Sequence, residues 1–542
     1  MDLPTSWSAT HGWMTSWVLP CLAAALLALR YFAHRANEAG RMDASARARL
    51  ERGVTVGLLL AAALSVATYV DFGRFRYGTY VNEWDTYHYY LGTKYLAELG
   101  YDGLYEATVL ADHESVHLFR GENVRDLRTY ELVPTQVALE SARRLRARFT
   151  PERWREFVAD VAWFERRLPS DRLAILLEDH GYNGSPPWSA TVGLVTNGLS
   201  FRSAIERWAI VLLDPLLLGL MVVAVGWAFG RNAAAVVVIL VGTHYLLSWG
   251  HLKGCILRTD FAACAVIAAC LLRKERFGAA GAMLGWSVVA RAFPVVFAFG
   301  PGLVLLATLV RERRLDRDLL RFFAAMGAVV AAACALAAYR YGGLEVFTAW
   351  LSKIEVHTLE GSDWNIGLRP LVDVRFVDGL PQQVFASHVL EEEPELQAMR
   401  SSILWSVRLA ALVPATYFAT FLKPHQAFAF GFVYLFFLVS PDYYYFLILC
   451  VPLVYYLDQE HHFHHTVGVG FMLLTGAFGY LLFSGWERMR DVSPIFHGFR
   501  QTFGTTYFLS WAIELTVLHM IALAAFRGYV LTKRRATVRA DA

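Results

Sequence analysis

Apolar residues gather in long runs separated by polar segments, and this pattern predicts a membrane protein. A helix needs about 20 apolar residues to cross the hydrocarbon core, and shorter runs more often form broken or dipping helices inside a bundle. The candidate runs are residues 13–33, 53–70, 208–229, 233–249, 259–272, 277–292, 294–310, 322–341, 403–422, 427–439, 443–457, 466–484 and 508–530. We therefore predict an all-α polytopic membrane protein with about 11–13 transmembrane or membrane-dipping helices.

The composition agrees with this class. Hydrophobic residues make up 56% of the 542 residues, and the mean hydropathy is +0.37, whereas soluble domains contain about 45–50% apolar residues. The net charge of +3 gives no reason to expect a nucleic-acid partner. Nearly all of the six cysteines lie in apolar runs, so we expect no disulfide framework and no metal knuckle. The first run lacks a basic leader and a clear cleavage site, and we expect it to be retained as a span.

Basic residues in the short connections indicate how the chain is oriented. Lys and Arg cluster in residues 30–52, 273–276, 311–321 and 533–535, and the positive-inside rule puts these segments on the cytoplasmic side. The loops 71–207 and 342–402 are then extracytoplasmic. This alternation requires residues 277–310 to form two passes or a re-entrant pair, with a turn at 291–294 where Pro294 cannot continue a helix. We divide the chain into two N-terminal transmembrane helices (1–70), a large loop with a helical insertion (71–207), central spans and half-helices (208–341), a second loop (342–402) and C-terminal spans with a basic tail (403–542).

The large loop is expected to contain helices of its own. Thr150-Pro151 is typical of an N-cap and a first helical residue, and the apolar residues that follow fall on one helix face. A second helix is predicted from Ser170 to before residue 181. Residues 183–187 form a predicted turn into Trp188, and the mildly apolar segment 190–199 is expected on the membrane surface.

Two acidic residues stand among four aromatics in the stretch 81–90. Carboxylates at a membrane edge cost free energy unless they face water or a partner. We therefore hypothesise that Glu83 and Asp85 belong to a catalytic site. Either carboxylate can act as a general base for an acceptor hydroxyl. Because the two residues are two positions apart, a helix would point their side chains in different directions, whereas a strand would place them on one face. We expect only one of the two carboxylates to transfer the proton. His88 and Tyr89 are candidate substrate-binding residues, and Asp85 and His88 on one helix face would need a third ligand to hold a cation. The alternative interpretation is an interfacial aromatic belt with solvated acids.

Three cations near the apolar runs are candidates for binding a phosphate. Lys253 and Arg258 lie in a short predicted extracytoplasmic connection, where Gly254 would let the backbone approach a ligand closely. Arg291 lies between two apolar runs, where an unpaired cation is costly. The alternatives are snorkelling for Lys253 and Arg258 and a structural ion pair for Arg291.

Further candidates lie in the second loop and beyond it. His357, Asn365 and Arg369 are candidates for contacts with a sugar or a phosphate, and loop solvation explains them nearly as well. Tyr443 begins a tyrosine triplet that is suited to stacking on a sugar or holding a prenyl chain, or to an interfacial girdle. The His-rich tract 461–465 is typical of metal binding, but the predicted topology puts it on the side opposite to the acidic stretch.

Several stretches in order along the chain resemble the GT-C superfamily of membrane glycosyltransferases, and within it the polyprenyl-phosphate-mannose-dependent family 87. The matching stretches are Asp85-Thr86-Tyr87-His88-Tyr89-Tyr90 with Leu99-Gly100-Tyr101-Asp102-Gly103-Leu104-Tyr105, then Tyr182 with Pro186-Pro187-Trp188, Lys253-Gly254, Arg273-Lys274-Glu275-Arg276, Gly281, Gly285, Arg291-Ala292-Phe293-Pro294, Trp364-Asn365-Ile366-Gly367-Leu368 and Leu438-Val439-Ser440-Pro441-Asp442-Tyr443. The resemblance covers residues from about 80 to 457. The chain departs from the family in its long segment 106–180 and in Lys253-Gly254-Cys255, where the family pattern has Gly-Gln.

The resemblance implies a GT-C fold with extracytoplasmic loops that carry juxtamembrane helices. It also implies that Asp85 is the catalytic base of an inverting transfer from a polyprenyl-phosphate-linked sugar, such as mannose, to a lipid or glycan hydroxyl. No cofactor is then required. The use of a divalent metal stays open, because the superfamily contains metal-dependent and metal-independent enzymes.

Two other functions stay open on the sequence. The chief alternative is a lipid-linked sugar flippase or transporter, in which intramembrane charges line a route; the chain has no apparent internal repeat of the kind that such proteins often carry. The other is a polymer ligase or phosphoethanolamine transferase, and the latter would need a metal-rich soluble domain. We expect an integral protein of a bacterial inner membrane, in contact with membrane lipids, with its site on the periplasmic or extracellular side.

Overall fold

The computed structural model describes residues 7–73, 75, 79–168, 170–247, 253–360, 365–377, 380–384, 389, 392–458, 462–481 and 505–540. Nearly all of the regular structure in these ranges is helical. Within them, 7 helices are long and apolar enough to cross a membrane. The chain is therefore an all-α polytopic membrane protein, because helices satisfy their own backbone hydrogen bonds in lipid.

The long candidate spans are single helices or two helices in tandem. They are α1 (Trp7–Glu38), α2 (Ala44–Tyr69), α11 and α12 (Ala204–Val211 and Leu213–Phe229), η5 and α16 (Phe293–Ala298 and Phe299–Glu312), α17 (Arg317–Arg340), α21 (Pro394–Ala419) and α27 (Thr505–Ala540). Shorter helices complete the bundle: α13 (Arg231–Thr243), α14 (Asp260–Arg273), α15 (Phe277–Ala290), α22 (Pro424–Leu438), η6 and α23 (Tyr443–Leu449 and Cys450–Leu457) and α24 (Phe463–Gly479). Each predicted apolar run coincides with one of these helices or tandem pairs, apart from residues 248–249 and 482–484, which lie outside the described residues.

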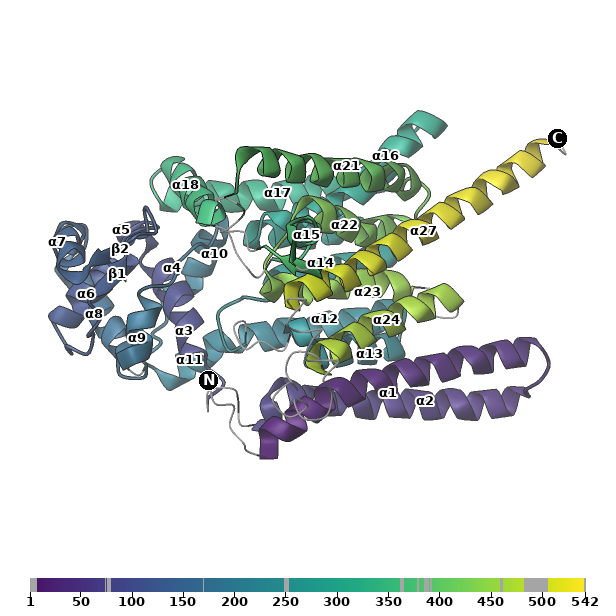
Figure 1. Cartoon of the computed structure of the whole chain (residues 1–542), viewed down its shortest axis with the longest axis horizontal. Coiled ribbons are helices and arrows are strands. Elements are labelled where there is room, and N and C mark those ends of the chain that lie inside the picture. The colour runs from purple at the N-terminus through teal and green to yellow at the C-terminus, as the bar shows by residue number, and fades with distance from the viewer. Residues whose placement is uncertain are drawn as a thin grey trace.

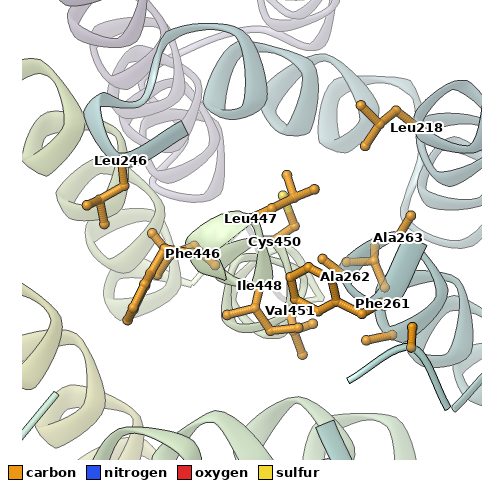
Figure 2. Packing of buried hydrophobic residues seen from close by; sticks show 14 of the residues in the cluster. Leu218, Leu246, Phe261, Ala262, Ala263, Phe446, Leu447, Ile448, Cys450 and Val451 are labelled. Atoms are coloured by element: carbon orange, nitrogen blue, oxygen red, sulfur yellow. The ribbon is translucent and has the colours of Figure 1, made fainter. Parts of the chain in front are cut away.

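The short helices η6 and α23 occupy the middle of the bundle. Figure 2 shows Phe446, Leu447 and Ile448 surrounded by side chains of neighbouring helices, among them Leu218 and Phe261. These three residues of η6 are at most 4% exposed. Full burial on all sides explains why the segment is apolar throughout although it is too short to cross a bilayer alone.

The predicted break after residue 290 is present. Helix α15 ends at Ala290, Arg291 has extended backbone angles, and η5 begins at Phe293 with Pro294 in its first turn. On its other face α15 packs closely on α17, where a Cβ at Gly281 would overlap the carbonyl oxygen of Phe322. The result is a pair of helices with a non-helical arginine between them.

Residues 79–203, which we call the loop domain, lie at one end of the bundle (Figure 1). Helix α18 (Glu345–Glu360) of the second predicted loop lies at the same end, whereas the α1–α2 turn, the end of α16 and the C-terminus lie at the opposite end (Figure 1). The loop domain contains α3 (Glu83–Thr86), η2 (Tyr87–Leu91), α4 (Gly92–Lys94), α5 (Leu96–Leu99), α6 (Leu104–His113), β1 (Asn123–Arg125), β2 (Leu132–Pro134), α7 (Thr135–Arg146), α8 (Pro151–Glu165), α9 (Ser170–Leu176) and α10 (Pro186–Thr196).

The few strands form two antiparallel hairpins in the described residues. In the loop domain, β1 pairs with β2 through Val124 opposite Val133. In the second loop, β3 (Val374–Val377) pairs with β4 (Leu380–Gln383). A short helix, α19 (Arg369–Val372), precedes β3.

Both predicted helices of the large loop are present. The side chain of Thr150 caps α8 by accepting a hydrogen bond from the backbone N–H of Arg153. The predicted surface segment 190–199 is largely the helix α10, capped by Ser185. Only part of it is exposed, because Trp188 and Ala190 are both 0% exposed. One face of α10 packs on α17 and on the loop domain, while Leu194 and Val195 are 60% and 49% exposed; the expectation that this segment lies at the membrane surface stays a prediction.

A buried ion network fastens α8 to the stretch that contains the acidic motif. The side chain of Lys94 is 0% exposed and lies 2.7 Å from Glu156 and 2.9 Å from Asp160. The Tyr95 hydroxyl donates to the same Asp160 carboxylate at 2.9 Å. A buried lysine requires such partners, since an uncompensated charge in a low-dielectric interior is costly. The segment 106–180 is thus joined rigidly to the start of the loop domain.

Candidate functional site

The acidic motif begins a short helix that rests on the connection between α13 and α14. The side chain of Asn82 caps α3 by accepting from the backbone N–H of Asp85 at 3.2 Å. The backbone N–H of Asn82 donates to the carbonyl oxygen of Gly254 at 3.0 Å. Gly254 has φ +73°, and a Cβ there would overlap the carbonyl oxygen of Tyr80. Glycine at this position therefore allows close approach of the chain's own backbone, and the expectation that it also approaches a ligand stays a prediction.

This connection brings Arg258 against Asp85. The Nε of Arg258 lies 2.9 Å from Oδ2 of Asp85, and the two side chains are 6% and 15% exposed. The backbone at Arg258 is held in place by Asp214 of α12, whose carboxylate accepts from the N–H groups of Arg258 and Thr259 at 2.8 and 3.0 Å. An ion pair with this little exposure is screened weakly by solvent. Asp85 and Arg258 thus form one fixed unit that stays partly open to solvent on the side of the carboxylate.

Tyr89 connects this unit to Arg291. The guanidinium carbon of Arg258 lies 3.8 Å from the centre of the Tyr89 ring, and Nη2 of Arg291 donates to the Tyr89 hydroxyl at 3.3 Å. The hydroxyl in turn donates to Oδ1 of Asn183 at 2.7 Å. The phenol ring therefore positions two guanidinium groups next to each other, and cation–π attraction offsets part of the cost of burying them.

Both arginines keep unused donors. Arg291 donates through Nη1 to the carbonyl oxygen of Ala290 at 2.7 Å, but its buried Nε has no hydrogen-bond partner among the described residues, nor has the buried Nη1 of Arg258. Buried donors without a partner are rare in folded proteins and call for a ligand or an ordered water. Two such guanidinium groups side by side form a suitable site for a phosphate, because their planar donors match its oxygens.

Lys253 belongs to the same connection and lies beside Tyr69, which lines an apolar groove. Its Nζ donates to the carbonyl oxygen of Tyr69 at 3.1 Å and lies 4.2 Å from the centre of the Tyr69 ring. The groove has a volume of about 560 Å³ and runs between α2, α12 and α13, with Trp208 at its edge. A small cavity of about 30 Å³ shares Tyr69 with the groove and reaches Thr259 and Tyr444. The groove thus leads from the apolar bundle toward the residue that follows Arg258.

Glu83 does not share this environment. Glu83 and Asp85 lie on the same short helix two residues apart, so their side chains diverge. Burial raises the pKa of the Glu83 carboxyl, and Arg167 of the loop domain and Arg207 of α11 oppose that shift. The structure therefore brings Asp85, and not Glu83, to the arginine pair.

The imidazole ring of His88 makes its hydrogen bonds within the loop domain. Its Nε2 lies 2.7 Å from the Tyr105 hydroxyl, and its Nδ1 lies 3.0 Å from the carbonyl oxygen of Trp84. Burial lowers the pKa of His88, although the carboxylates of Asp179 and Asp85 oppose this shift. Both ring nitrogens of His88 thus have partners within the loop domain, and the expectation that His88 binds a substrate stays a prediction.

The candidates in the second loop and the tyrosine triplet have other contacts. His357 lies 3.4 Å from the Tyr130 hydroxyl, Asn365 pairs with the backbone of Asp442, and Arg369 lies 3.3 Å from Asp373. Tyr443 packs edge-on against Tyr444 at 5.6 Å between ring centres. These four candidates are not brought to Asp85 by any contact in the described part of the chain, and Trp364 of the second-loop motif lies outside it.

Sequence reasoning overlooked Asp214 and Asp260, and from the tyrosine triplet it chose Tyr443 although Tyr445 makes the contact. Asp214 holds the backbone of Arg258, and Asp260 accepts hydrogen bonds at 3.0 Å from the indoles of Trp188 and Trp286. Tyr445, not Tyr443, lies 5.6 Å from the guanidinium carbon of Arg291. Both acids lie within or at the start of a predicted apolar run, and an acid in that position is itself a signal for a functional or structural partner.

In the ranges that the structure covers, no three potential ligands gather in a way that would hold a metal ion. Of the histidine tract, His461 lies outside the described residues, and His465 is buried with its Nδ1 3.0 Å from the carbonyl oxygen of Tyr456. The described histidines therefore give no support to the metal-binding interpretation of this tract.

Comparison of the chain with protein-family models, with curated proteins and with solved structures gave no match.

Proposed function

We propose that this chain is an inverting glycosyltransferase of the GT-C type, which moves a single sugar, mannose or a related one, from a polyprenyl-phosphate carrier to a hydroxyl of a lipid or glycan. The observation that carries the proposal is the carboxylate of Asp85 held 2.9 Å from Arg258 and next to the Arg258–Tyr89–Arg291 cluster. A partly exposed carboxylate beside two cations with unused donors provides a base and an anion site within one small volume.

The reaction assigns a separate role to each group. The acceptor oxygen attacks the anomeric carbon while the bond from that carbon to the phosphate oxygen breaks, and the phosphate leaves with the bonding electrons. Asp85 takes the proton of the acceptor hydroxyl and later releases it to water. The products are an inverted glycoside and a polyprenyl phosphate, and no oxidant or reductant is consumed.

Arg258 has two roles in this proposal. Without donor, its Nε pairs with Asp85 and its Nη1 has no hydrogen-bond partner among the described residues. A bound phosphate would accept from Nη1 of Arg258 and from Nε of Arg291, and would draw part of the positive charge of Arg258 away from Asp85. Donor binding would thus loosen the ion pair and leave the Asp85 carboxylate available to the acceptor hydroxyl, which couples donor binding to proton transfer. Both arginines stabilise the charge that develops on the leaving phosphate.

The apolar groove supports a lipid-linked donor. Its volume of about 560 Å³ lies in the range of about 300–1,000 Å³ that is typical of small-molecule sites. Tyr69 lines both the groove and the small cavity that reaches Thr259, next to Arg258. We assign the prenyl chain to this groove, because a prenyl phosphate needs an apolar groove that leads directly to a cationic phosphate site. Lys253, at the junction, would contact the phosphate or the first prenyl units.

We also propose that the protein lies in a bacterial inner membrane with this site on the periplasmic or extracellular side. The basic segments 30–52 and 311–321 lie at the end of the bundle opposite to the loop domain (Figure 1), and the positive-inside rule assigns basic connections to the cytoplasm.

The proposal is tested by transfer assays with purified protein in lipid nanodiscs. A panel of synthetic polyprenyl-phosphate sugars is offered with a membrane lipid extract as acceptor, and the release of polyprenyl phosphate is measured together with the glycosylated product. We expect both products from at least one donor. Movement of intact donor across vesicle bilayers without release of polyprenyl phosphate would contradict the proposal and favour a flippase.

A further inference from the structure

A second, polar pocket lies where α10 and the end of α17 meet the start of the loop domain. It has a volume of about 330 Å³ and is lined by Thr93, Lys94, Ala97, Glu98, Arg153, Asn197, Arg340 and Tyr341. Arg340 is the last residue of a candidate span. The pocket therefore lies at the level of the membrane interface, and the residues of the Asp85 site are not among its lining.

The cations of this pocket differ in how far they are neutralised. Lys94 is paired with Glu156 and Asp160, and Arg153 is paired with Glu98 at 2.7 Å and with Glu156 at 3.0 Å. Arg340 donates to the carbonyl oxygen of Gly193 at 3.2 Å, and it has no carboxylate partner among the described residues. In its favoured orientation the amide oxygen of Asn197 also accepts from Arg340, so the partners of this guanidinium group are neutral and its charge is not balanced by a carboxylate in an ion pair within the described ranges.

Two further polar atoms at the pocket are buried: Oε2 of Glu98, which lacks a hydrogen-bond partner in the described part of the chain, and the hydroxyl of Tyr341, which interacts with the side chain of Arg340. Both belong to the same neighbourhood. Burial raises the pKa of Tyr341 to about 12, Arg340 opposes this shift, and the Glu98 carboxylate adds to it. A donor from Arg340, a donor from Tyr341 and an acceptor from Glu98 therefore surround one space.

Exposed apolar side chains flank the pocket. On α10, Leu194 and Val195 are 60% and 49% exposed, and near the end of α17, Tyr339 and Leu344 are 89% and 74% exposed. Apolar side chains exposed to this extent next to a polar pocket are expected where lipid covers the surface. A ligand with a polar head and apolar chains fits both parts of this surface.

We propose that this pocket binds the phosphoethanolamine headgroup of a membrane phospholipid. The phosphate accepts from the guanidinium group of Arg340 and from the Tyr341 hydroxyl, and the ammonium group donates to Oε2 of Glu98. Among the described residues, the pocket offers one cation without a carboxylate partner and one carboxylate oxygen without a hydrogen-bond partner, so a zwitterion matches it better than an anion alone. The acyl chains lie against Leu194 and Val195. The site is independent of the proposed sugar transfer.

The test is native mass spectrometry of the delipidated full-length protein, titrated with phospholipids of identical acyl chains. Phosphatidylethanolamine is compared with phosphatidylcholine, whose methylated amine cannot donate to Glu98, and with phosphatidylglycerol, which has no amine. We expect the first phosphatidylethanolamine to bind about tenfold more tightly than either of the others, the size of one charge-assisted hydrogen bond. Equal binding of the three lipids, or preference for phosphatidylglycerol, would overturn the proposal.

Variants locate the site. R340Q is expected to weaken phosphatidylethanolamine binding about tenfold, and Y341F, which removes only a hydroxyl, by a few-fold. The matched control is R321Q on the same helix, because Arg321 is 72% exposed and pairs with Asp318 near the other end of α17; this variant is expected to bind as the wild type does. Unchanged selectivity in R340Q and Y341F would place the lipid elsewhere and refute the assignment. The assay contains no sugar donor, so its outcome does not depend on the proposed enzymatic function.

Discussion

The guanidinium group of Arg258 lies 2.9 Å from the carboxylate of Asp85, although the two residues come from segments far apart in the sequence. Two contacts bring them together: Gly254 packs on the backbone of the acidic motif, and Asp214 fixes the backbone at Arg258. Neither residue has the freedom of a surface side chain. In the proposed reaction this pairing holds the base and the phosphate site at a fixed position relative to each other.

The first prediction concerns the shape of the cation at position 258. R258K keeps the charge but loses the planar fork and the stacking on Tyr89, because an ammonium group is a compact point charge. We expect sugar transfer to fall by about 10²-fold or more, the size found when one preorganised donor is removed from a charge-stabilising site, with weaker donor binding. Steady-state kinetics at varied donor concentration measures both effects. R155K is the control, because Arg155 is 76% exposed and pairs with Glu152 away from the site; a loss in R155K equal to that in R258K would refute a specific role for Arg258.

The second prediction concerns the buried lysine of the loop domain. K94M leaves the carboxylate of Asp160 in an interior where the side chain is 0% exposed. Arg202 stays 3.1 Å from Asp160 in this variant, and removing one partner of a buried ion pair costs at most about 3–5 kcal/mol, so we expect a fall in the thermal unfolding midpoint and faster proteolysis within residues 106–180. K274M, at an exposed lysine 5.4 Å from the ring centre of Trp227, is expected to behave as the wild type does. A K94M protein with unchanged stability would show that this network does not fasten the loop domain.

The third prediction concerns pH. Glu165 is 1% exposed, and neither carboxylate oxygen has a hydrogen-bond partner in the described ranges. Burial, with a smaller contribution from Asp112, raises the pKa of the Glu165 carboxyl to about 8. The folded protein therefore holds this proton more tightly than the unfolded chain does, so the contribution to stability is complete below about pH 4.5 and is lost as the pH rises toward about 8.

Thermal unfolding of wild type and E165Q between pH 5 and 9 measures this effect. The wild type is expected to lose stability with rising pH, by an amount on the order of a few kcal/mol at about 1.4 kcal/mol per pKa unit. The neutral amide of E165Q should flatten this dependence and make the variant more stable than the wild type at pH 9. Parallel pH curves for the two proteins would contradict the assignment of a protonated Glu165.

Local patterns in the sequence were enough to predict the helices. Runs of apolar residues predicted the spans, Thr150 predicted the start of α8, and Pro294 predicted the break after α15. These features depend on residues a few positions apart, so periodicity and capping rules reach them.

The site depended on contacts that such rules do not reach. The pairing of Asp85 with Arg258 and the choice of Tyr445 over Tyr443 follow from how distant helices pack. His88 has the residue type of a ligand-binding group, yet both its nitrogens meet groups of the loop domain. Asp214 could have been noticed in the sequence, because it is an acid within an apolar run. Its role, which is to hold the backbone of Arg258 and Thr259, depends on contacts that only the structure shows.

The central claim is that Asp85 is the base of a sugar transfer, and comparison of D85N with E83Q tests it most directly. Both variants replace one carboxylate of the same short helix by its amide, so each controls for the other. Transfer from a synthetic polyprenyl-phosphate sugar is measured in nanodiscs at matched thermal stability. The account predicts that D85N loses about 10²–10⁴-fold in rate, the contribution of a general base, while E83Q stays within a few-fold of the wild type. Equal activity of D85N and wild type, or a larger loss in E83Q, would contradict it.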